Sequence, residues 1–172
     1  FETIAASKGM TDGHKVEAVK MLARACGHEG MVLGQQYDLD AEKNELLNIE
    51  LIHSLKTAKL IQVALTMPYL GNEIYNKTQE LLNDIGAKIG LAFQIMDDVL
   101  EVSSDSMTLG KSNLSDITNK KMTYVSVYGL EESIHKAEAL SSLCIKQIQE
   151  NFELDKTKEL TELMNLMVSR SN

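Results

Sequence analysis

Apolar residues recur every three or four positions along nearly the whole chain, which is the spacing of one face of an α-helix. Only Pro68 and ten glycines interrupt this pattern in 172 residues. Residues 121–128 have the composition of a short strand, but an isolated strand has no partner, so we expect the buried start of a helix that Gly129 ends. The sequence therefore predicts an all-α protein whose helices are joined by short polar turns.

Local signals predict where the helices begin and end. Capping side chains stand at Thr11 or Asp12 and at Asn48, and Pro68 helps to end the helix that Asn48 begins. The expected helices cover a segment after Asp12, residues 49–67, 73–101 and 131–150, and a last segment capped by Asp155. Loops are expected at residues 43–45 and 102–116, and a break near Asn83 is left open. The apolar stripes are expected at Val16, Val19, Leu22 and Ala23 in the first helix and at Leu160, Leu163, Met164 and Met167 in the last.

Composition narrows the classes of partner. A net charge of -8 argues against nucleic acid, because a phosphate backbone needs a basic surface. Phosphorylated small molecules are not excluded, provided that a metal ion and a few lysines intervene. With 44% hydrophobic residues, we expect one domain with a sizeable core. The chain has no apolar run long enough to predict a membrane span. Its two cysteines, Cys26 and Cys144, are far apart and form no disulfide framework, which indicates a reducing cytoplasm.

The most informative stretch is the acidic helical pattern of residues 90–101. Its apolar side is expected at Ile85, Ile89, Ala92, Phe93, Met96, Val99 and Leu100. Gln94, Asp97, Asp98 and Glu101 share the other side, where like charges four positions apart weaken a helix. A divalent cation such as Mg²⁺ would remove this repulsion, since it prefers oxygen ligands. The alternative is a solvated acidic face, the usual fate of such runs.

Lysines stand on both sides of the acidic stretch. Lys111, Lys120 and Lys121 follow it, on a polar segment that would carry ammonium groups back towards the carboxylates, as a diphosphate site requires. Lys56 precedes it, one turn after His53 in an expected helix. The alternatives are ordinary surface lysines, a Lys56 stem that lies along apolar surface with its ammonium in water, and a purely structural His53.

Four blocks of sequence occur in an order and at separations that can be compared with those of a known protein family. They are GHEGMVLGQQYDL at residues 27–39, IHSLKT at 52–57, FQIMDDVLE at 93–101, and LGK, SD and KMTY at 109–111, 115–116 and 121–124. In this order and with these separations, the chain resembles the trans-isoprenyl diphosphate synthases, most closely the bacterial farnesyl diphosphate synthase type. The similarity runs from end to end of the chain.

The resemblance implies a fold and a reaction. The fold would be an antiparallel helical bundle of the isoprenoid synthase type, with residues 1–172 as the C-terminal part of a single domain that lacks its N-terminal helices here. The reaction would be the Mg²⁺-dependent head-to-tail condensation of an allylic diphosphate with isopentenyl diphosphate. Farnesyl diphosphate is the favoured product and geranylgeranyl diphosphate the next, and a homodimer is expected.

The resemblance also implies roles for residues. The metal ligands would be Asp97, Asp98 and Glu101, holding Mg²⁺ or Mn²⁺. The substrate-binding residues would be Lys56, Lys111, Lys121, Gln94 and Asp38, of which Asp38 supports a lysine or a metal-bound water. The catalytic residues would be Lys56, Thr57 and Gln94. Thr57 and Gln94 would turn oxygen dipoles towards the carbocation, and the metal and lysines would stabilise the charge that builds on the leaving group.

Two departures from the family pattern matter. Glu101 stands where the family usually has aspartate, and its longer side chain would reach a metal either directly or through water. The family's first aspartate-rich motif and its residues for isopentenyl diphosphate lie before the position that matches Phe1. A chain that consisted only of these 172 residues is therefore expected to be inactive and to expose an apolar face.

Other functions are weighed against this one. The alternative from a different class is a non-catalytic binding or regulatory subunit of a prenyltransferase complex, against which the full set of lysine, glutamine and aspartate residues argues. A terpene cyclase with a related helical fold is disfavoured, because the IHSLKT and LGK blocks resemble those of chain elongation.

Overall fold

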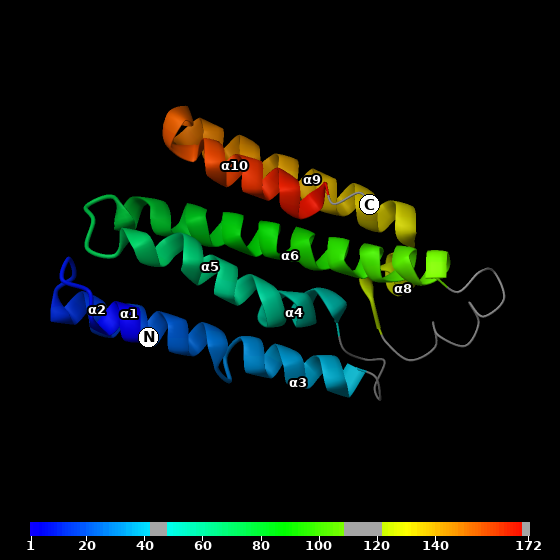
Figure 1. The fold of residues 1–172 in the computed structure, drawn as a ribbon, viewed down its shortest axis with the longest axis horizontal. Coiled ribbons are helices and arrows are strands. Elements are labelled where there is room, and N and C mark those ends of the chain that lie inside the picture. Colours follow the sequence, from blue (N-terminus) through cyan, green and yellow to red (C-terminus); the bar gives the residue numbers. More distant parts are fainter. Residues whose placement is uncertain (42–47, 109–121, 170–172) are drawn as a thin grey trace.

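The computed structural model describes residues 1–41, 48–108 and 122–169, and the regular structure within these ranges is entirely helical (Figure 1). The elements are α1 (Glu2–Ala5), α2 (Asp12–Cys26), α3 (Met31–Ala41), α4 (Ile49–His53), the π-helix η1 (Ser54–Ala58), α5 (Lys59–Thr66), the 3₁₀-helix η2 (Met67–Tyr69), α6 (Tyr75–Thr108), α8 (Tyr124–Tyr128), α9 (Leu130–Asn151) and α10 (Leu154–Val168). The predicted all-α fold is confirmed.

Helix α6 is the central element of the bundle. It has 34 residues and therefore a length of about 50 Å. On one side it packs against the row formed by α4, η1 and α5, which α2 and α3 cover in turn, and on the other side it packs against α9 and α10 (Figure 1). Chain direction reverses from each row to the next, so the bundle is antiparallel. None of the helices in the described ranges is both long enough and apolar enough to cross a bilayer.

The core lies between α6 and its neighbours on both sides. The fully buried large side chains include Ile52, Ile85, Ile89, Ile95, Ile148 and Met164. The predicted apolar side of the acidic helix is confirmed at Ile85, Ile89, Ala92, Met96 and Val99, all of which are buried. Burying such side chains stabilises the fold by about 1.5–3 kcal/mol each, so the face of α6 that points inward is set by this stripe.

Two predicted helix caps are confirmed. The Oγ1 atom of Thr11 accepts a hydrogen bond from the His14 amide at 3.2 Å, and Oδ1 of Asn48 accepts one from the Glu50 amide at 2.8 Å. The predicted cap at Asp155 is wrong, because Glu153 is the N-cap residue of α10 and Asp155 lies within its first turn. An aspartate in that turn still interacts favourably with the helix dipole, which explains why the predicted N-cap position lies two residues after the observed one.

The helix α6 is longer than the sequence predicted. It continues past Asn83 without a break, because Leu82 and Ile85 are buried on either side and the cost of one asparagine in a helix is small. It also includes residues 102–108, which were predicted as part of a loop. The hydroxyl of Ser103 donates to the Val99 carbonyl at 2.8 Å, a bond that lets serine stay inside a helix.

The buried stripes of the first and last long helices differ in part from the prediction. In α2, Val16 is exposed and the buried positions are Ala18 and Ala25. In α10, Met164 and Val168 are buried whereas Leu163 is exposed. Small residues form the packed side of α2 because it lies close to α5, and a pattern based on large apolar residues does not show this.

Candidate functional site

A π-helical turn carries two of the predicted catalytic residues. The sequence predicted one helix over residues 49–67, but between α4 and α5 the turn η1 has the wider π geometry, and Lys56 and Thr57 lie on it. Such turns hold an extra residue and are frequent at functional sites. The turn therefore changes the direction in which Lys56 and Thr57 point relative to an uninterrupted α-helix.

Two glycines from distant helices hold this turn in place. A Cβ atom at Gly34 of α3 would lie 2.6 Å from the Cα of Lys56, and one at Gly90 of α6 would lie 2.6 Å from the Cα of Ala58. Real Cβ contacts are never this short, so α3 and α6 approach η1 more closely than any other residue would allow. Backbone packing on two sides thus positions Lys56 and Thr57.

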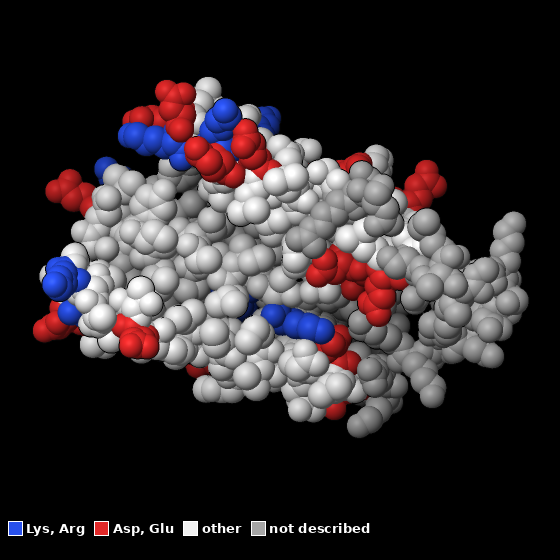
Figure 2. Space-filling view, in the orientation of Figure 1, with Lys and Arg blue, Asp and Glu red and all other residues white. Residues whose placement is uncertain are grey.

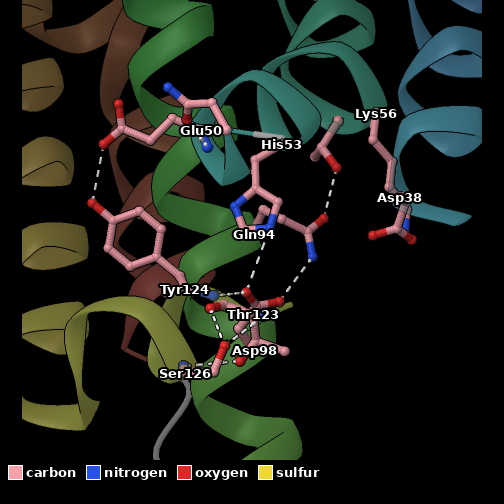
Figure 3. A network of polar contacts seen from close by, with 11 residues as sticks. Asp38, Glu50, His53, Lys56, Gln94, Asp98, Thr123, Tyr124 and Ser126 are labelled. Atoms are coloured by element: carbon pink, nitrogen blue, oxygen red, sulfur yellow. Dashed lines mark hydrogen bonds and ion pairs between the residues drawn. The ribbon is translucent and has the colours of Figure 1, made fainter. Parts of the chain in front are cut away.

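Lys56 lies beside the predicted residue Asp38. Its Nζ donates to Oδ2 of Asp38 at 2.6 Å, and both side chains are largely but not fully buried, with 28% and 16% of their surface exposed. The ammonium group therefore keeps access to solvent. The Asp38 carboxylate beside it fixes its position (Figure 3). A partly buried, oriented ammonium can bind a second anion such as a diphosphate oxygen.

Thr57 and Gln94 form the next link. The Thr57 hydroxyl donates to Oε1 of Gln94 at 2.7 Å, and Nε2 of Gln94 lies 3.4 Å from Oδ1 of Asp98 (Figure 3). The residues come from η1 and from α6, 37 positions apart in the chain. The structure therefore brings together the three residues that the resemblance implied as catalytic, Lys56, Thr57 and Gln94, on one side of the bundle.

The three predicted carboxylates lie on α6 in different surroundings. Asp97 is half-buried, Glu101 is exposed, and Asp98 is buried, with 3% of its surface exposed. Oδ2 of Asp98 accepts a hydrogen bond from the Tyr124 amide at 2.7 Å and lies 3.4 Å from Nε2 of His53. The two adjacent aspartates are thus not equivalent.

A buried group next to the site was not predicted from the sequence. His53 is 3% exposed and stacks on Tyr124, with ring centroids 6.3 Å apart, and the Tyr124 hydroxyl donates to Glu50 at 3.2 Å. Burial, followed by the nearby Glu50 carboxylate, raises the pKa of Tyr124 to about 12. The sequence signals were the place of His53 one turn before Lys56 and the expected buried helix start at residues 121–128, which includes Tyr124, but neither signal showed that the two side chains would meet.

Some predicted residues lie outside the described ranges. These are Lys111 and Lys121, together with Lys120, which was weighed against Lys121. On the face seen in Figure 2, acidic side chains gather over the C-terminal part of α6, and basic atoms lie next to them over the row of α4 and α5. Opposite charges therefore meet where η1 and α6 face each other.

The chemistry of the donor set fits Mg²⁺ in part. Within the described ranges, no group of three or more histidine, cysteine, aspartate or glutamate side chains is arranged to hold a metal ion alone. Asp97 and Glu101 stand one helical turn apart and both reach solvent. One or two carboxylates, with water and phosphate completing the shell, are what Mg²⁺ ordinarily takes from a protein, so the residues present fit a metal that arrives with a diphosphate.

Comparisons with known proteins identify the family of this chain. Residues 1–164 match the family model described as "Polyprenyl synthetase". The chain is 34% identical over 177 residues to geranylgeranyl pyrophosphate synthase 7, chloroplastic, of Arabidopsis thaliana, which covers 100% of this chain and 51% of the relative. It is 41% identical over 121 residues to the farnesyl diphosphate synthase of Micrococcus luteus, which covers 69% of this chain and 42% of the relative.

A solved structure shows the same fold. The geranyltransferase from Helicobacter pylori complexed with magnesium and isoprenyl diphosphate matches with a TM-score of 0.69 and 30% identity, over 97% of this chain and 53% of that one. The chain spans about half the length of the relatives that it matches.

Proposed function

This chain belongs to the polyprenyl synthetase family, and from that premise we propose that it is the C-terminal portion of a prenyl diphosphate synthase. The reaction joins an allylic diphosphate to isopentenyl diphosphate. The bond between the allylic carbon and the diphosphate oxygen breaks, the double bond of isopentenyl diphosphate attacks the resulting cation, and a proton leaves. The observation that carries the proposal is the meeting of Lys56, Thr57 and Gln94 beside the carboxylates of α6.

Each residue has a role that its contacts support. The Lys56 ammonium, held by Asp38 at 2.6 Å, binds diphosphate oxygens and stabilises the charge that builds on them as the carbon–oxygen bond breaks. Thr57 and Gln94 fix each other through their 2.7 Å hydrogen bond, so their oxygen dipoles keep one orientation beside the cation. Neither is a strong nucleophile, so neither traps the cation readily.

Of the three implied ligands, Asp97 and Glu101 are open enough to hold Mg²⁺, whereas Asp98 is buried. When bound, the ion neutralises negative charge on the diphosphate. The Helicobacter pylori relative was solved with magnesium and isoprenyl diphosphate, which supports this choice of metal over Mn²⁺. Lys111 and Lys121 remain proposed substrate-binding residues outside the described ranges.

Two products of different chain length are candidates. Farnesyl diphosphate is the first candidate, supported by the Micrococcus luteus and Haemophilus influenzae farnesyl diphosphate synthases, and geranylgeranyl diphosphate is the second, supported by the Arabidopsis thaliana relatives. The homodimer and the cytoplasmic location stay predictions.

The experiment measures prenyl transfer by the full-length protein that contains this chain, with geranyl and isopentenyl diphosphates and Mg²⁺. We expect Lys56→Ala to lower kcat/KM by about 10²- to 10³-fold, because the leaving-group charge loses its fixed cation. The matched control is Lys88→Ala, which removes another lysine bonded to an aspartate but lies nine positions before Asp97 on α6, and it should stay within about twofold.

The alternative function has a distinct result. A wild-type protein that binds diphosphates but makes no prenyl product, under conditions where an added partner chain does, would support the non-catalytic subunit instead.

A further inference from the structure

We propose that Asp98 is a positioning residue rather than a ligand of the metal. It holds the backbone of Tyr124 and, with His53, fixes the start of α8 against α4 and α6. The metal is then left to Asp97 and Glu101. This inference deepens the proposed function and rests on it for the role of the metal, whereas the contact of Asp98 with Tyr124 stands on the structure alone.

The first argument is direction along the helix. Residues four apart share one face of a helix, whereas adjacent residues point about 100° apart. Asp97 lies with Glu101 on the part of the helix surface that reaches solvent, whereas Asp98 points about 100° away from Asp97 and is buried against His53 of α4 and Tyr124 of α8. An ion that Asp97 holds at the surface therefore lies away from the direction in which the Asp98 carboxylate points.

The second argument is that protein groups already face both oxygens of the Asp98 carboxylate. Oδ2 of Asp98 accepts from the Tyr124 amide at 2.7 Å and faces Nε2 of His53 at 3.4 Å, and Oδ1 faces Nε2 of Gln94 at 3.4 Å. Both oxygens are thus turned towards protein N–H groups, and the side chain is 4% exposed. Mg²⁺ keeps several water molecules and gives up its hydration reluctantly, so a buried carboxylate that is already hydrogen-bonded is a poor ligand for it.

The third argument is what the contact holds. Thr123 and Ser126 form a capping box in which each backbone amide donates to the other residue's hydroxyl, at 3.0 and 3.1 Å. Neither hydroxyl accepts a hydrogen bond from the Tyr124 amide, which donates to Asp98 instead. The Tyr124 ring contacts both His53 and Tyr128, and its hydroxyl reaches Glu50 (Figure 3). Asp98 therefore links α6 to the first residue of α8 and, through His53, to α4.

Asparagine separates the two roles of an aspartate. Asp98→Asn keeps an oxygen that can accept from the Tyr124 amide but lacks the charge that a Mg²⁺ ligand needs, whereas Asp98→Ala loses both. If Asp98 positions Tyr124, the asparagine variant rescues what alanine loses. If Asp98 binds metal, asparagine fails as alanine does. Asp97→Asn is the matched comparison, because it makes the same chemical change at the neighbouring position.

The test uses the full-length protein and two readouts. Hydrogen–deuterium exchange of the Tyr124 amide, without metal or substrate, reports the contact itself. We expect exchange to rise by about tenfold or more in Asp98→Ala and to change by less than about threefold in Asp98→Asn and Asp97→Asn. The Mg²⁺ concentration that gives half-maximal diphosphate binding reports ligation, and we expect a rise of about tenfold in Asp97→Asn but less than about threefold in Asp98→Asn.

A second pair of variants, at His53, keeps the test decisive if the Asp98→Ala protein does not fold. His53→Gln retains a side-chain N–H that can face Asp98, and His53→Leu does not, so Tyr124 exchange should rise only in the leucine variant. The proposal is overturned if Asp98→Asn shifts the Mg²⁺ requirement as Asp97→Asn does, or if no Asp98 variant changes the exchange of Tyr124. A wild-type protein without prenyl transfer would refute the proposed function, and the exchange measurement would still decide the role of Asp98.

Discussion

Tyr124 shows how one side chain can make stability depend on pH. Its ring is buried, its hydroxyl donates to Glu50 at 3.2 Å, and its pKa is raised to about 12, first by burial and then by the Glu50 charge. The folded protein therefore favours the protonated phenol. The stabilisation is fully present below the unfolded value of about 10 and is lost as the pH rises through the folded pKa.

We expect Tyr124→Phe to lower the free energy of unfolding by about 0.5–1.5 kcal/mol at pH 7, because the hydrogen bond to Glu50 is lost. The difference between wild type and variant should shrink as the pH rises from about 10 towards about 12, and urea denaturation at several pH values measures it. The control is Tyr128→Phe, whose side chain is half-exposed, and which should change stability by less than about 0.5 kcal/mol. A difference that grows with pH would contradict the assignment.

The difference between Asp97 and Asp98 could not be predicted from the sequence. Both are aspartates of one acidic run, and the sequence expectation treated them alike. The burial of Asp98 depends on Tyr124, which is 26 positions away, and on His53 of another helix. Periodicity shows which side of its own helix a residue lies on, but it does not show which backbone amide will meet that side.

Among the elements, the turn η1 depends most on its neighbours. We expect Gly34→Ala to push Lys56 away from Asp38, because the added Cβ would lie 2.6 Å from the Cα of Lys56. The change should lower the free energy of unfolding by about 1–3 kcal/mol and kcat by about 10²-fold, since small misplacements of catalytic groups are costly. Urea denaturation and the prenyl transfer assay measure the two effects.

A helix position with open space gives the control for this glycine. Gly13 lies in α2, and a Cβ there would have its nearest neighbour at 4.0 Å. Gly13→Ala should leave kcat unchanged and stabilise the protein by up to about 1 kcal/mol. If the two alanine variants behaved alike, close packing on η1 would not be what positions Lys56.

Helix boundaries were predicted well where the signal is local and poorly where it is not. Thr11 and Asn48 each bond an amide two or three residues ahead, so their own sequence neighbourhood was enough. The π-turn was not predicted, because it follows from the approach of Gly34 and Gly90, which belong to other helices. The length of α6 was also underestimated, since residues 102–108 are mostly polar and yet continue the helix.

For the whole molecule, Asp84 joins two of the main helices. It accepts from Lys88 on α6 and from Gln147 on α9 at 3.0 Å. The hydrogen bonds from Lys88 and Gln147 hold its pKa below the usual 3.8. The resulting stabilisation is present above the unfolded pKa and is lost as the pH falls through the lower folded value.

We expect Asp84→Asn to lower the free energy of unfolding at pH 7 by no more than about 1 kcal/mol, because the side chain is 46% exposed and solvent screens the pair. The difference from wild type should shrink as the pH falls below the unfolded value of 3.8, as urea denaturation at neutral and at progressively more acidic pH would show. Glu162→Gln, from an exposed pair 4.0 Å apart on α10, is the control. A loss that stayed the same as the pH fell would point to packing rather than charge.

The antiparallel order of the rows also bears on how the protein is made. Since α6 packs on α5, α9 on α6, and α10 on α9, each long helix meets a surface that left the ribosome before it. The chain can therefore fold in the order of its synthesis, without waiting for a distant segment to close the core. The contacts of Tyr124 with Asp98 and Glu50 follow the same order, since both partners are synthesised before Tyr124 and α9 and α10 after it, so the site can be completed before the last two helices close the bundle.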